Sequence, residues 1–191
     1  MKKKEVNQLI ELINKTSCKL EEHLNIYTPV INSDKNGIHE ANLTLQFAHQ
    51  CLGKGWFVYP EASNVYQDSS AKKPIRLDLH VICRDEFILT VESKKLYSVD
   101  KGKELIADFK RAQSIQYPHC YNDLPHFILL LAVTESSEYE NWWCQSHNWQ
   151  NDTPVWQELA QILEREGMVK SSFAIDADKT HYLLYAITQV R

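Results

Sequence analysis

The chain has 191 residues, of which 43% are hydrophobic and 24% charged, a composition typical of one globular domain. Its net charge of −4 argues against a protein that coats nucleic acid through bulk charge, and its longest apolar run, residues 127–133, is too short to cross a bilayer. Five cysteines without framework spacing, and no apolar stretch after the N-terminal lysines, favour reduced thiols in the cytoplasm and no signal peptide.

Hydrophobic periodicity predicts an alternation of helices and strands along the chain. An amphipathic helix over residues 3–24 comes first, followed by a polar turn at 32–37. The further elements are, in chain order, a helix at 39–52, a strand at 56–62, a loop at 64–74, strands at 76–83 and 87–94, a helix at 101–114, a buried strand at 127–134, a helix at 154–166 and a strand at 181–187. This order predicts an α/β fold with a mixed central sheet flanked by helices, in a single domain over 1–191.

Two adjacent strands carry a pair of carboxylates. If the charged turn Arg84–Glu86 has three residues, Cys83 pairs with Phe87, and Asp78 then lies opposite Glu92. Directly opposed side chains are about 5 Å apart at Cβ. Two carboxylates at that distance destabilise each other unless a cation lies between them, and Mg²⁺ or Mn²⁺ prefers such oxygen ligands.

The same register places Arg76 opposite Lys94, beside the carboxylates. The residues around the two carboxylates are Ile75-Arg76-Leu77-Asp78 in the first strand and Val91-Glu92-Ser93-Lys94 in the second. This pattern resembles the signature of the PD-(D/E)xK, or restriction-endonuclease-like, nucleases. The proline that the family usually carries before the aspartate is replaced by Leu77.

The resemblance extends to the order of the elements. The family has an αβββαβ core, which matches residues 39–134. The N-terminal helix (3–24) and a C-terminal helix-strand extension (135–191) are then additions to this core.

The resemblance implies a set of site residues. Asp78, Glu92, Lys94 and Glu40 would be catalytic, and Asp78, Glu92, Ser93 and Glu61 would form the metal site for Mg²⁺ or Mn²⁺. Lys94 would orient the attacking water or stabilise the transition state as a point charge. Glu40 lies on or beside the apolar stripe of its helix, but an acid that favours the helix N-terminus would look the same.

Basic residues gather in the central stretch of the sequence. Those expected to bind nucleic-acid phosphates are Lys95, Lys101, Lys103 and Arg111. A solvated helix, with Glu104 and Asp108 as the partners of these cations, explains the same pattern. His80 shares the predicted face of Asp78, either as an outer residue of the site or as a satisfied polar group.

The function implied is that of an Mg²⁺-dependent endonuclease acting on DNA, with RNA as an open alternative substrate. The enzyme could act as a homodimer, and no membrane partner is expected. A binding module of the same fold that has lost catalysis, such as an immunity or adaptor protein, is the alternative. A third explanation of the motif is an exposed hairpin with alternating surface charges. For the cluster of Trp142, Trp143, Trp149 and Trp156, core packing is favoured over base stacking.

Overall fold

The computed structural model describes residues 3–27, 30–32, 35–64, 75–115, 123–145 and 153–190. Most of the predicted loop 64–74 and Trp149 lie outside these residues. The helices are α1 (Lys3–Ile26), α2 (Glu40–Gly53), α3 (Val99–Gln113), α4 (Ser137–Gln145) and α5 (Pro154–Leu163). The strands are β1 (Val30–Asn32), β2 (Lys35–Asn36), β3 (Phe57–Asn64), β4 (Ile75–Cys83), β5 (Phe87–Lys95), β6 (His126–Thr134), β7 (Val169–Ala174) and β8 (Tyr182–Gln189).

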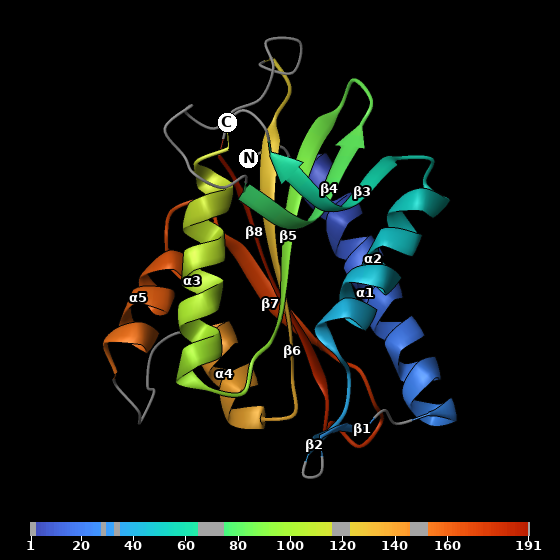
Figure 1. Cartoon of the computed structure of the whole chain (residues 1–191), viewed down its shortest axis with the longest axis vertical. Helices are drawn as coiled ribbons and strands as arrows, with labels where there is room; N and C mark the ends of the chain where they lie inside the picture. The colour runs from blue at the N-terminus through green and yellow to red at the C-terminus, as the bar shows by residue number, and fades with distance from the viewer. Residues whose placement is uncertain are drawn as a thin grey trace.

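A mixed six-stranded sheet forms the centre of the molecule, with strand order β3-β4-β5-β6-β8-β7. Strands β5 and β6 are parallel and are joined through α3, while the other neighbours are antiparallel. Helices α1 and α2 cover one face, and α3, α4 and α5 cover the other (Figure 1). The predicted α/β class and the mixed sheet are confirmed.

Each face of the sheet has its own apolar core. Leu43 and Phe47 of α2 pack with Leu89 and Phe127 on the first face. The core of the second face contains the inward side of α3 and three tryptophans, Trp142, Trp143 and Trp156. All three are buried, so the prediction of aromatic core packing is confirmed for them.

The hairpin between β4 and β5 has the predicted register. Cys83 pairs with Phe87, and the paired residues continue to Leu79 and Val91. The three-residue turn closes with a hydrogen bond from Glu86 N to Cys83 O of 3.1 Å. This register fixes which side chains of the hairpin face α3.

Asp85, in the middle of this turn, has a left-handed backbone with φ of 60°. We expect Asp85→Val to lower the free energy of unfolding by about 1–2 kcal/mol, because a β-branched side chain is strained in that region. Asp85→Gly should leave stability unchanged or raise it slightly. Thermal denaturation of the two variants makes the comparison; equal stability would show that the turn does not hold this conformation in solution.

Three features differ from the sequence predictions. The C-terminal extension was expected to contribute one helix and one strand, but residues 135–190 also form α4 and β7, and β8 pairs along β6 as part of the central sheet. Helix α5 ends at Leu163, three residues before the predicted end at 166. The predicted polar turn at 32–37 overlaps two short paired strands, β1 and β2, and the pairing begins at Val30.

Leu77 and Leu79 do not share a face of the sheet, as strict alternation along β4 would require. Leu79 packs in the first core and Leu77 in the second. The pairs Pro60–Leu79 and Ala62–Leu77 flank Glu61, whose φ is 53°. Glu61 and Asp78 are left out of the ladder between these pairs, so the regular pairing is interrupted where Leu77 and Leu79 diverge.

No helix in the described part of the chain combines the length and the apolar character needed to cross a bilayer.

Candidate active site

The two predicted carboxylates lie at the end of the paired part of β4 and β5. The last paired residues there are Leu79 and Val91. The Asp78 carboxylate accepts a hydrogen bond of 2.7 Å from the backbone N–H of Ser93, the residue after Glu92. Asp78 is half-buried, whereas Glu92 is 1% exposed.

The carboxylate of Glu92 is buried without hydrogen-bond compensation. Neither of its oxygens has a hydrogen-bond partner among the described residues. The guanidinium of Arg111 lies 3.9 Å from Oε1 of Glu92, beyond hydrogen-bond distance. Burial of a carboxylate in this way is costly when it is charged.

The pKa values of both acids follow from this burial. Burial raises the pKa of Glu92 to about 9, and the negative charges of Asp108 and Asp78 act in the same direction. Burial also raises the pKa of Asp78, although the hydrogen bond from Ser93 opposes this shift. In the metal-free protein, Glu92 is therefore protonated at neutral pH.

Lys94 lies on the face of β5 that is covered by α3. Its ammonium is 2.8 Å from Oδ2 of Asp108, and its side chain is 12% exposed. Burial acts to lower the pKa of Lys94, but the hydrogen bond and the charge of Asp108 outweigh it, so that the pKa is raised. Lys94 is therefore charged and is directed toward α3.

Asp108 of α3 lies beside Lys94, a position that the sequence analysis did not predict. The alternative of a solvated helix named it as a partner of the basic residues, and it does pair with Arg111, but it is 5% exposed and also pairs with Lys94. Its spacing from Leu105 and Ala112 places it on the buried stripe of α3. That spacing was the signal available in the sequence, since an acid on an apolar stripe needs a partner.

Glu40 has the position expected of a helix N-terminal acid, and its side chain also contacts the end of β5. It is the first residue of α2, where an acid favours the helix dipole. Its Oε1 also accepts a hydrogen bond of 3.0 Å from the backbone N–H of Lys95 and lies 3.5 Å from the ammonium of Lys101. Glu40 thus links α2 to the end of β5 and to α3.

Glu61 and Ser93 occupy different positions from Asp78 and Glu92. Glu61 is exposed and forms an ion pair with Arg76. Arg76, which was predicted to lie opposite Lys94, therefore has Glu61 as its ionic partner. The charge of Glu61 nevertheless acts on Asp78. The backbone of Ser93 contacts Asp78, but its buried hydroxyl has no hydrogen-bond partner among the described residues.

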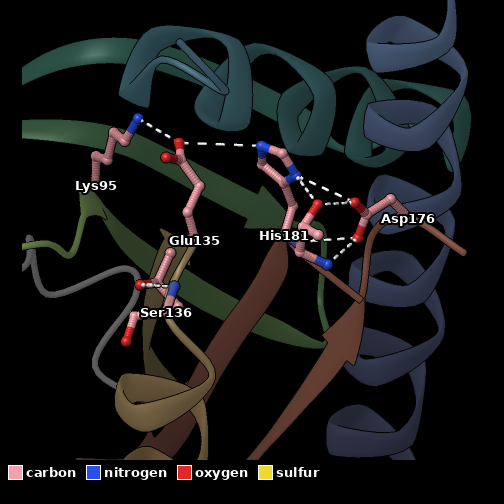
Figure 2. Close-up of polar contacts among 7 residues, drawn as sticks. Lys95, Glu135, Ser136, Asp176 and His181 are labelled. Carbon is pink, nitrogen blue, oxygen red and sulfur yellow. Dashed lines mark hydrogen bonds and ion pairs between the residues drawn. The ribbon is translucent and has the colours of Figure 1, made fainter. Parts of the chain in front are cut away.

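Lys95 is buried and belongs to a separate polar cluster. Figure 2 shows its ammonium bonded to Glu135 at 2.6 Å, and the same carboxylate lies 4.0 Å from His181. The other ring nitrogen of His181 is 3.2 Å from Asp176. Lys95 was predicted to bind nucleic acid, but its ammonium is buried against Glu135 and does not extend into solvent.

The other predicted phosphate-binding residues lie along α3. Lys101 bonds Glu104 at 2.8 Å, and Lys103 bonds Asp100 at 3.0 Å. Arg111 lies at the other end of the helix and pairs with Asp108. Each of these cations therefore has an acidic partner within the chain.

His80 is half-buried, and burial lowers its pKa to about 4, so its imidazole is neutral at physiological pH. Its ring lies 6.4 Å from that of Tyr59, on the neighbouring strand. A neutral imidazole adds no charge to the site.

A divalent cation at Asp78 and Glu92 would have few protein ligands. Among the residues that the structure describes, no group of three or more His, Cys, Asp or Glu side chains is close enough to hold a metal ion. Mg²⁺ commonly takes only one or two carboxylates and completes its shell with water and substrate oxygens. The oxygens of Glu92, which have no hydrogen-bond partner among the described residues, and the carboxylate of Asp78 are donors of the kind that such a cation takes.

Comparison of the chain with protein-family models, with curated proteins and with solved structures gave no match.

Proposed function

We propose that this chain is a metal-dependent nuclease that hydrolyses phosphodiester bonds of DNA, with Mg²⁺ or Mn²⁺ bound by Asp78 and Glu92. The observation that supports it is the buried carboxylate of Glu92, which has no hydrogen-bond partner in the described residues and lies within electrostatic range of Asp78. The resemblance to the PD-(D/E)xK pattern and the register of β4 and β5 agree with this proposal.

Asp78, Glu92 and Lys94 would have different roles in hydrolysis. A bound divalent cation polarises a phosphate and lowers the pKa of a bound water. Asp78 and Glu92 would hold the cation, and the charged Lys94 would stabilise the negative charge that develops as water attacks phosphorus. The P–O3′ bond breaks as the new P–O bond forms, leaving a 5′-phosphate and a 3′-hydroxyl, as the resemblance implies.

A nuclease-like binding module, of the immunity or adaptor kind, is the second candidate. It is favoured by the pairing of the central basic residues with acids of the same chain, as in Lys95–Glu135, Lys101–Glu104 and Lys110–Glu158. Such pairs reduce the positive potential available to a phosphate backbone. The dense set of carboxylates around Lys94 has no evident purpose in this candidate.

Cleavage assays distinguish the two. Supercoiled plasmid, single-stranded DNA and RNA are incubated with Mg²⁺ or Mn²⁺ and with wild type, Glu92→Gln or Lys94→Met. We expect cutting by wild type that EDTA abolishes and that either substitution lowers at least about 100-fold. Lys19→Ala, an exposed change on α1, is the matched control and should cut normally.

The result on the three substrates assigns DNA or RNA. If wild type cuts nothing, calorimetric titration with Mn²⁺ decides between the candidates. If wild type binds Mn²⁺ and Glu92→Gln does not, the proposed metal site is supported. If wild type binds no Mn²⁺, the proposal is contradicted and the binding module is favoured.

A further inference from the structure

Asp108 lies between two cations and the candidate metal site. One carboxylate oxygen is 2.8 Å from the ammonium of Lys94, and the other pairs with the guanidinium of Arg111. Both cations also act electrostatically on Glu92, where their charges lower the pKa that burial raises. Through its two ion pairs, Asp108 therefore sets the positions of the two cationic side chains beside Glu92.

The same two cations could neutralise the metal-binding carboxylates. The guanidinium of Arg111 needs to move only from 3.9 Å to hydrogen-bond distance to pair with Glu92. Lys94 lies two positions along β5 from Glu92, on the same face, and its charge already acts on Asp78. A cation bound there would compete directly with a divalent metal ion.

What holds both cations away is a buried acid on a rigid element. Asp108 is 5% exposed, in the middle of a 15-residue helix whose apolar face is packed against the sheet. Arg111 follows on the next turn of the same helix, so the pair between them is local and needs no long-range adjustment. In this arrangement Glu92 has no hydrogen-bonded partner within the part of the chain that the structure describes.

We infer that Asp108 is a positioning residue that keeps Arg111 and Lys94 off the Asp78–Glu92 pair, so that these carboxylates remain available to a divalent cation. The inference rests on the proposed function, because it assumes a metal site at Asp78 and Glu92. It assigns Asp108 no contact with metal or substrate. Its effect is exerted through the two basic side chains.

The experiment is calorimetric titration of metal-free protein with Mn²⁺ alone, without nucleic acid. Asp108→Asn keeps the shape of the side chain and removes its charge, so Arg111 and Lys94 should turn to Glu92 and Asp78. We expect the affinity for Mn²⁺ to fall at least about tenfold. Asp100→Asn, an exposed change on the same helix, should bind as wild type does.

The double variant Asp108→Asn with Arg111→Gln separates positioning from a general structural role. Removal of Arg111 takes away one of the two competing cations, so affinity should rise at least about threefold above that of Asp108→Asn. Because both charges of the local pair are gone, this variant also tests the inference if Asp108→Asn alone does not fold.

The outcomes are distinct. Loss of binding in the single variant and recovery in the double variant support the inference. Equal binding by wild type and Asp108→Asn would overturn it, as would a folded double variant that fails to regain affinity. Wild type that binds no Mn²⁺ overturns the proposed metal site itself, and the inference with it.

Discussion

Glu92→Gln is expected to raise the free energy of unfolding of the metal-free protein, by an amount that increases with pH. Burial raises the pKa of Glu92 to about 9 in the folded state, whereas in the unfolded chain it is near its usual 4.5. Between these values the folded protein holds a proton that the unfolded protein has released. Stability is therefore lost as the pH rises through this window.

Glutamine has nearly the same shape and does not ionise. The difference in stability between the variant and wild type should be small near pH 5 and grow by up to about 1.4 kcal/mol per pH unit toward pH 9. Urea denaturation in EDTA at pH 5, 7 and 8.5 measures it. Glu166→Gln, at an exposed position, is the control and should show no such growth.

Addition of Mn²⁺ should raise the stability of wild type relative to that of Glu92→Gln. A ligand that binds only the folded state stabilises it by about 2.7 kcal/mol at one hundred times its dissociation constant. Wild type should gain this stability, while Glu92→Gln should gain little because it lacks one of the two carboxylates. A variant that is equally destabilised at every pH would instead show that Glu92 is ionised and paired without metal.

Trp143→Ala should destabilise the fold more than any surface change, by about 3–5 kcal/mol. The indole is fully buried in the core under α4, and its N–H donates a hydrogen bond of 3.0 Å to the carbonyl of Tyr185 in β8. Removal of the ring leaves a cavity between α4 and the sheet and an unpaired carbonyl.

Trp143→Phe separates these contributions. It keeps most of the buried ring and loses the hydrogen bond, so it should cost about 1–2 kcal/mol. Tyr27→Ala, at a side chain that is 67% exposed, should change stability by less than about 0.5 kcal/mol. If Trp143→Ala were as stable as the Tyr27 variant, α4 would not be packed on the sheet in solution.

Features that depend on nearby residues could be predicted from the amino-acid sequence. The turn of three residues sets the register of Cys83 with Phe87, because hairpin pairing follows from loop length. Alternation along β5 then places Glu92 and Lys94 on one face, and periodicity gives the bounds of α2 and α3 to within one or two residues. The candidate pair Asp78 and Glu92 could be named for this reason.

The long-range partners of these side chains depend on how distant segments pack together, and they could be found only in the folded structure. Lys95 was expected to face a phosphate backbone, but β6 brings Glu135 to its ammonium from forty residues away. Lys94 meets Asp108 only because the crossover from β5 to β6 packs the buried stripe of α3 over the strand. The insertion of β8 beside β6 likewise depends on the pairing of segments about fifty residues apart, which local pattern does not encode.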